Sequence, residues 1–277
     1  MTNTETLTIA QLIKAELPPL PGSVARITSM LHDMRVSRSM IADAISLDPV
    51  LSTRILRLAN SSAYSQQREV TSVSAAIAAV GNRAISDILL VSGVGDSFGR
   101  KVLTSPTGRN VWLHSLATGT IASDLCRLAR LKNAEDAFSC GLLLDLGQLI
   151  MLRADSEFYP TVVDNVPPSE DVCAIERAVY GFDHAELGYY AAESWQLPEH
   201  ICQMIKYHHR PVDTIDESEI IAMLSIADQL VSLRQSFEEI DELVESDVVR
   251  SYGFTEFQLD HVWDGMIDRV TEMMQMT

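Results

Sequence analysis

Basic residues are scarce in this sequence of 277 residues. Lysine and arginine total 21 against 38 aspartate and glutamate residues, which gives a formal net charge of −17. A field of that sign repels phosphate backbones and anionic lipid surfaces. The composition therefore disfavours bulk nucleic-acid binding, although it does not exclude a local basic patch on the surface.

Cysteine is also scarce, and its spacing gives no metal-binding or disulfide pattern. The four cysteines are Cys126, Cys140, Cys173 and Cys202, and no two of them form a Cys-x-x-Cys pair. In a chain of this size we interpret them as ordinary buried thiols in a reducing compartment.

The sequence lacks an apolar run long enough to cross a bilayer, which takes about 20 residues. The longest apolar stretch, Cys140 to Leu152, is shorter and is interrupted by Asp145 and Gln148. The first six residues have neither the basic start nor the apolar core of a secretory signal. We therefore expect a cytoplasmic protein with no membrane segment.

Short motifs of nucleotide and ester chemistry are missing as well. There is no Gly-Lys-Ser/Thr phosphate loop, and Gly93-Val94-Gly95 lacks the third glycine of a dinucleotide fingerprint. No serine stands in a nucleophile elbow, so serine hydrolysis is disfavoured.

What the sequence does contain is helical patterning along almost its whole length. Asp48 followed by Pro49 is typical of a helix start, because aspartate caps the free amides and proline suits the first turn. Thr255 and Gln258 have the spacing of a capping box at the start of the last helix. No stretch alternates like a strand with hairpin turns. The predicted fold class is all-α.

The chain is predicted to have three parts. Residues 7–98 form an N-terminal lobe of short helices, and glycines between Gly99 and Gly108 mark a joint. A second helical lobe spans residues 108–234, and residues 235–277 form a C-terminal helical extension. The last helix carries an apolar stripe, which either closes the core or builds a homodimer.

The most informative segment runs from Gly141 to Gln148, with the sequence Gly-Leu-Leu-Leu-Asp-Leu-Gly-Gln. It resembles the Gly-Leu-Leu-His-Asp-Ile-Gly-Lys segment of the helical phosphohydrolases named after a His-Asp doublet. In those enzymes the adjacent imidazole and carboxylate bind a divalent metal. This chain has Leu144 in place of the histidine and Gln148 in place of the lysine. Leucine has no lone pair, and a metal site depends on the identity and number of its ligands.

Further motifs follow in a fixed order from about Leu17 to Leu230, and together they resemble the HDOD domain. This domain is the degenerate, signalling-associated relative of the HD and HD-GYP phosphohydrolases, so the resemblance implies an HD-like bundle of many helices. The blocks that carry it are Leu17-Pro18-Pro19-Leu20-Pro21, Ile45 to Ser61, Ala76 to Gly81, His114-Ser115, Ala137 to Gly147, His184 to Gly188, Trp195 to Pro198 and His208-His209.

The resemblance also implies a metal site. In an active relative the matching residues would hold one or two metal ions and activate a bound water. The residues that match such ligands here are His114, Asp145, His184, His208, His209 and Asp228. Because Leu144 removes one core ligand, we expect these to be vestigial, with no catalytic residue, no cofactor-binding residue and no cofactor.

Each of these residues also has a plain structural interpretation. His114 and Asp145 would satisfy one another in the core. His208-His209 would cap a helix end or lie on the surface. His184 would be exposed in a first helical turn, and Asp228 would be either part of the old site or a polar residue on a helix edge.

The resemblance implies a non-catalytic bacterial signal-transduction module, which acts as a sensor or scaffold by binding a signalling protein or a small ligand. Two alternatives stay open. One is a residual metal-dependent phosphohydrolase of the HD superfamily, with Mn, Fe or Mg as its divalent metal. The other is a non-hydrolytic receptor for a nucleotide second messenger.

Overall fold

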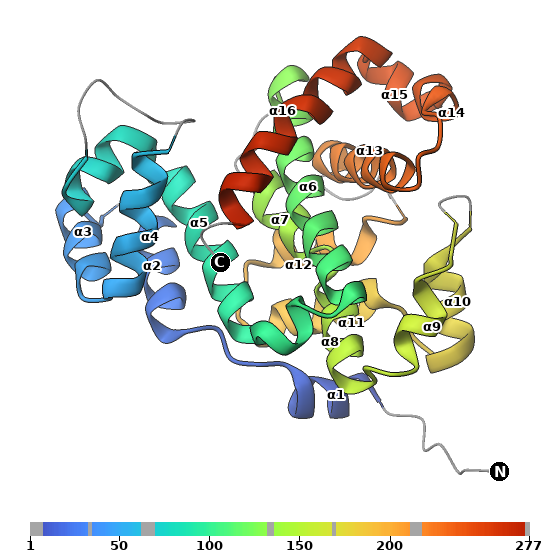
Figure 1. The fold of residues 1–277 in the computed structure, drawn as a ribbon, viewed down its shortest axis with the longest axis horizontal. Coiled ribbons are helices and arrows are strands. Elements are labelled where there is room, and N and C mark those ends of the chain that lie inside the picture. The colour runs from blue at the N-terminus through green and yellow to red at the C-terminus, as the bar shows by residue number, and fades with distance from the viewer. Residues whose placement is uncertain are drawn as a thin grey trace. The chain divides into compact units, whose positions relative to one another are not determined.

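The computed structural model describes residues 8–32, 35–61, 70–131, 136–167, 170–210 and 218–274. Every regular element in these residues is a helix, which confirms the all-α prediction (Figure 1). The helices form two compact units. The small unit comprises Pro18–Arg100 and Asp268–Thr277, and the large unit comprises Met1–Leu17 and Lys101–Ile267.

The units divide the chain differently from the predicted parts. The sequence suggested a separate extension at 235–277, but the described residues up to Ile267 belong to the large unit. The helices α14 (Asp241–Glu245) and α15 (Asp247–Tyr252) contact α13 (Ser218–Gln235), and apolar side chains such as Leu243 and Val249 are buried. Burial of these side chains attaches the segment to the large unit.

The small unit is a helical core built from local signals that the sequence displays. Its helices are α2 (Gly22–His32), α3 (Arg38–Ser46), α4 (Pro49–Ala59) and most of α5 (Val73–Leu103). Helix α4 begins where predicted, because the Asp48 carboxylate accepts hydrogen bonds from the amides of Val50 (3.0 Å) and Leu51 (3.1 Å). Ile27, Ile45 and other apolar side chains fill the centre of the unit.

The large unit holds the remaining helices and all six predicted metal residues. Its helices are α1 (Ile9–Glu16), α6 (Pro106–Leu128), α7 (Ala137–Leu143), α8 (Leu146–Ala154), α9 (Tyr159–Val163), α10 (Val172–Tyr180), α11 (His184–Ser194), α12 (Glu199–Tyr207), α13, α14 (Asp241–Glu245), α15 (Asp247–Tyr252) and most of α16 (Glu256–Met274). The long α6 packs along α7 and α13, and α11 packs on α8 and α12 (Figure 1).

Two glycines allow helix backbones to touch around the segment singled out in the sequence. A Cβ atom on Gly141 would lie 2.3 Å from the Cα of Gly119, so α7 and α6 meet without side chains between them. A Cβ atom on Gly147 would lie 2.0 Å from the carbonyl oxygen of His184, so the backbones of α8 and α11 also meet without a side chain between them. These contacts bring Asp145, in the turn between α7 and α8, next to His184.

Two helical stretches in the described residues are long and apolar enough to cross a membrane by length and composition alone, Val73–Gly99 and Ala137–Ala154. In the second, 78% of the most apolar window is buried inside the protein. It is also divided by the turn at Leu144 and Asp145. Such burial is typical of core helices.

Candidate functional site

The structure brings all six predicted metal residues together in one cluster within the large unit. His184 and His208 have no exposed surface, and Asp145 and Asp228 are almost fully buried. The residues come from α6 (His114), the turn between α7 and α8 (Asp145), the start of α11 (His184), the end of α12 (His208 and His209) and α13 (Asp228). We call these six residues the histidine cluster.

One part of the cluster is a closed ion pair. His114 Nε2 lies 2.8 Å from Asp228 Oδ1, and His114 Nδ1 lies 3.3 Å from Gln235 Oε1. Burial opposes the imidazolium charge, but the hydrogen bond and charge of Asp228, helped by Asp145, raise the pKa of His114 to about 9. Both ring nitrogens of His114 then donate hydrogen bonds, and the pair needs no metal ion.

This pairing corrects the expectation that His114 and Asp145 satisfy one another. Asp145 Oδ2 is 3.9 Å from His114 Nε2, and the hydrogen-bond donor to Asp145 is instead Gln148, whose Nε2 lies 2.9 Å from Oδ1. Gln148 therefore binds the carboxylate from the position where the resemblance placed a lysine. Leu144 is buried, so it offers only apolar surface there.

The other part of the cluster is a set of imidazoles that face one another. His184 Nε2 lies 3.4 Å from His208 Nε2, 3.1 Å from His209 Nε2 and 3.5 Å from Asp145 Oδ1. His208 Nδ1 donates to the carbonyl oxygen of Ile205 at 2.6 Å, which leaves a lone pair on Nε2. Burial, with the neighbouring His209 and His184, holds the pKa of His208 well below its usual range.

His184 and His208 thus differ from their plain structural interpretations. His184 is fully buried and not exposed in a first helical turn. His208 does bond a helix-terminal carbonyl, as expected for a cap, but it is buried and its other nitrogen faces the cluster. Of His184, His208 and His209, His209 alone keeps part of its side chain exposed, at 26%.

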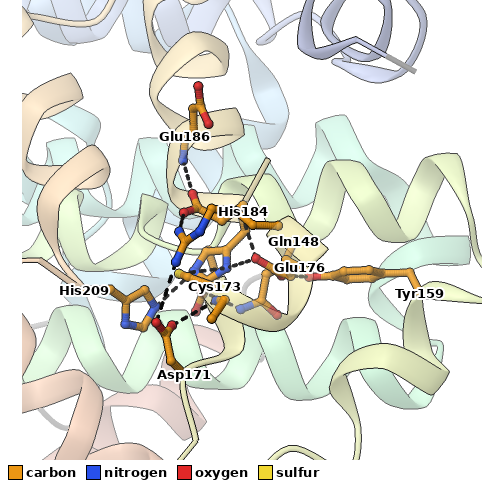
Figure 2. Close-up of polar contacts among 12 residues, drawn as sticks. Gln148, Tyr159, Asp171, Cys173, Glu176, His184, Glu186 and His209 are labelled. Atoms are coloured by element: carbon orange, nitrogen blue, oxygen red, sulfur yellow. Dashed lines mark hydrogen bonds and ion pairs between the residues drawn. The ribbon is translucent and has the colours of Figure 1, made fainter. Parts of the chain in front are cut away.

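Two residues that sequence reasoning missed support His184 from outside the cluster. Glu176 Oε2 accepts hydrogen bonds from His184 Nδ1 (2.7 Å) and from the His184 backbone amide (2.8 Å). Tyr159 donates its hydroxyl to Glu176 Oε1 at 2.7 Å, as Figure 2 shows. Burial works against ionised Glu176, but the charge of His184 keeps the pKa of Glu176 below its usual range.

The interpretation of the cysteines needs one correction. All four are free and buried, as expected. Cys173, however, lies beside the cluster, with its Sγ 4.0 Å from His184 Nδ1 and within 4.8 Å of a ring nitrogen of His209. Burial raises the pKa of its thiol, but hydrogen bonds with His184 and His209 outweigh this and lower it.

Salt bridges hold the two histidine-bearing segments together. Asp183 caps α11 by accepting from the amide of Glu186 at 2.8 Å. Its other carboxylate oxygen pairs with Arg177 and, at 3.2 Å, with Arg210. The residue before His184 is therefore tied to the residue after His209.

The facing imidazoles fit a single transition-metal ion. Ligand atoms bound tetrahedrally at 2.0–2.1 Å are separated by about 3.3 Å. The separations from His184 Nε2 to its three neighbours in the cluster, 3.1 to 3.5 Å, agree with that spacing. Imidazole nitrogens suit ions such as zinc and iron better than magnesium, which prefers oxygen. Asp145, His184 and His208 have ligand atoms within 4.8 Å of one another and would hold such an ion. His209 belongs to a second set of this kind, with Cys173 and His184.

The His114–Asp228 pair predicts how the metal-free protein responds to pH. The folded pKa of His114, about 9, lies above its ordinary value of 6.5, so its stabilisation is complete below pH 6.5 and is lost as pH rises through 9. The free energy of unfolding should therefore be higher at pH 6 than at pH 9.5, and we expect His114→Gln to reduce that difference by on the order of 2 kcal/mol. Urea unfolding with chelator at pH 6 and 9.5 measures it, and an unchanged difference between the two pH values would contradict the pairing.

Comparisons with known proteins place this geometry in a family. The chain matches the HDOD domain over residues 17–211. It is 28% identical over 202 residues to an uncharacterized protein of Treponema pallidum (strain Nichols), which covers 70% of this chain but only 38% of that longer protein.

Two solved structures are similar over nearly the full length. An HDOD domain protein of unknown function from Geobacter sulfurreducens is 27% identical with a TM-score of 0.72, covering 95% of this chain and 94% of that one. A candidate phosphohydrolase from Shewanella amazonensis SB2B shares the fold, at 24% identity and a TM-score of 0.74, covering 98% and 97%. The chain therefore belongs to the HDOD domain family.

Proposed function

We propose that this protein is a non-catalytic signal-transduction module, a sensor or scaffold that acts by binding a signalling protein or a small ligand. We further propose that its core binds one divalent metal ion through Asp145, His184 and His208, whose ligand atoms lie within 4.8 Å of one another. Binding there would tie the ends of α8, α11 and α12 to one another and would stabilise the folded chain.

One observation carries this proposal, the division of the histidine cluster into two unlike parts. His114 and Asp228 are bonded to each other at 2.8 Å, and Leu144 is a buried leucine that supplies no ligand. The remaining imidazoles face one another at the spacing of a metal site. A two-metal site needs ions on both sides of the reacting group, and here His114 and Asp228 are paired on one side. Gln148, which is bonded to Asp145, brings no positive charge toward a phosphate, and this supports binding without hydrolysis.

The proposal departs from our expectation of a chain with no cofactor. That expectation rested on the loss of a ligand at Leu144, a position that the resemblance groups with His114, Asp145 and Asp228. The part built on His184 keeps three ligand atoms within 4.8 Å of one another, two of them imidazole nitrogens. These imidazole ligands favour zinc or iron over magnesium.

The setting of the module is part of the same proposal. We place it in the bacterial cytoplasm, with no membrane and no bulk nucleic acid as partner. The net charge of −17 and the burial of its apolar helices support this setting. A homodimer through the last helix stays a proposal, as does the receptor alternative, which requires saturable binding of a nucleotide without turnover.

A second candidate function, residual metal-dependent phosphohydrolysis, is favoured by the same open set of imidazoles. It differs in requiring turnover. Gln148 counts against it, because this side chain binds Asp145 and brings no positive charge toward a phosphate.

Metal content and turnover test both candidates. We expect freshly purified protein to contain about one zinc, iron or manganese ion per chain, and His208→Ala to lose it because one imidazole ligand is gone. His261→Ala, which removes an exposed histidine of α16, is the matched control and should keep it. Elemental analysis measures the ion. We expect no turnover of p-nitrophenyl phosphate or a cyclic dinucleotide, and metal-dependent turnover abolished by Asp145→Ala would establish the second candidate instead.

A further inference from the structure

Glu176 is a buried carboxylate that the proposed metal site does not use directly. Neither it nor its two partners, Tyr159 and His184, has any exposed surface. A carboxylate at such depth is costly unless every acceptor site is satisfied. Three hydrogen bonds of 2.7 to 2.8 Å converge on Glu176, so its environment is built around the ionised form.

We propose that Glu176, held by Tyr159, is the positioning residue that orients His184 for metal binding. The inference rests on the proposed function, since it concerns the same metal site. Glu176 would not touch the ion. It would act through His184, whose second nitrogen faces the cluster.

The geometry determines which ring nitrogen of His184 is available. Because Nδ1 donates to Glu176 at 2.7 Å, the hydrogen on Nδ1 is kept, and Nε2 is the nitrogen that would release its proton and offer a lone pair to a metal ion. Nε2 is the atom that lies 3.1 Å from His209 and 3.4 Å from His208. A carboxylate on the outer nitrogen also makes an imidazole a more basic ligand.

Two hydrogen bonds from one residue fix the position of His184 as well as its hydrogen. Glu176 Oε2 accepts from the His184 backbone amide and from its ring, so it fixes both the start of α11 and the rotation of the imidazole. Tyr159, on α9, fixes the other carboxylate oxygen. Figure 2 shows Glu176 lying between the Tyr159 hydroxyl and His184. Helices α9 and α10 thereby determine where Nε2 points.

The experiment measures zinc affinity of the full chain by competition with a chromogenic chelator. We expect Glu176→Gln to weaken zinc binding about 10- to 100-fold, as losses of such outer carboxylates do. Tyr159→Phe removes one hydrogen bond and keeps the ring, so we expect a smaller loss of about three- to tenfold. Urea unfolding of each metal-free variant shows whether it is folded.

The chain offers a matched control on α11. Tyr189 donates to Glu193 Oε1 at 2.9 Å, the same pair of side chains in an exposed position. Glu193→Gln should leave zinc affinity unchanged. If Glu176 had only a structural role, Glu176→Gln would lower the free energy of unfolding of the metal-free protein. The folded variant would still bind zinc as tightly as the wild type.

The possible failures can be told apart. If the wild type binds no zinc, manganese or iron, the metal part of the proposed function fails, and this inference fails with it. If the wild type binds zinc and both Glu176→Gln and Tyr159→Phe bind it equally tightly, only the positioning role is overturned. If Glu176→Gln does not fold, Tyr159→Phe decides: a weaker affinity supports the role and an unchanged affinity overturns it.

Discussion

Replacing Gly147 with alanine is expected to destabilise the large unit by about 3 kcal/mol, the upper end of overpacking effects. The added Cβ would lie 2.0 Å from the carbonyl oxygen and 2.7 Å from the carbonyl carbon of His184. These are backbone atoms, so no side-chain rotation relieves the clash, and α8 and α11 must move apart. The free energy of urea unfolding measures the effect.

The same displacement should also weaken metal binding. Asp145 immediately precedes α8 and His184 begins α11, so separating the helices lengthens the 3.5 Å approach of Asp145 Oδ1 to His184 Nε2. Gly22→Ala is the matched control, because Gly22 begins a helix and a Cβ there has no atom within 4 Å. Alanine favours helices, so Gly22→Ala should be neutral or slightly stabilising. Equal stability of the two variants would contradict the role of Gly147.

The fold class could be predicted because its signals are local. Asp48 and Thr255 mark helix starts through contacts with amides two or three residues away, and the structure has α4 and α16 beginning beside them. The close approach at Gly147 follows from a contact with a residue far along the chain. Sequence alone displays the glycine but not the carbonyl oxygen that requires it.

The residues of the site could be named, but not their pairing. The motif order predicted His114, Asp145 and Asp228 as ligands of one metal site, which stays a prediction, and the structure has both carboxylates within 4 Å of His114. The motif order could not show that His114 binds Asp228, 114 positions away, in preference to Asp145. That choice depends on the tertiary approach of α6 and α13.

Glu176 was missed for a similar reason, although the sequence contained a signal. On α10 it stands one turn after Cys173 and one turn before Tyr180, so a carboxylate interrupts an otherwise apolar helix face. A charge at such a position needs a buried partner. Sequence patterns identify the position, but only the packing of α10 against α11 identifies His184 as that partner.

Replacing His184 with alanine is expected to destabilise the metal-free protein by about 3–5 kcal/mol, because it leaves a buried carboxylate without its ionic partner. His184 and Glu176 are both fully buried, and their 2.7 Å contact joins groups whose charges compensate each other. His200→Ala is the surface control, since His200 lies 3.0 Å from Asp136 with 38% of its side chain exposed. An exposed pair should cost less than about 0.5 kcal/mol.

A double-mutant cycle separates the buried charge from the lost volume. If uncompensated charge on Glu176 causes most of the loss, His184→Ala combined with Glu176→Gln should be less destabilised than the sum of the two single variants by about 2 kcal/mol, within the range measured for contacting residues. If the loss arises from the cavity alone, the two changes should add. Additivity in chelator-treated protein would mean that Glu176 is not held ionised by His184. A coupling near 2 kcal/mol would show that the carboxylate and the imidazole act as one unit before any metal ion binds.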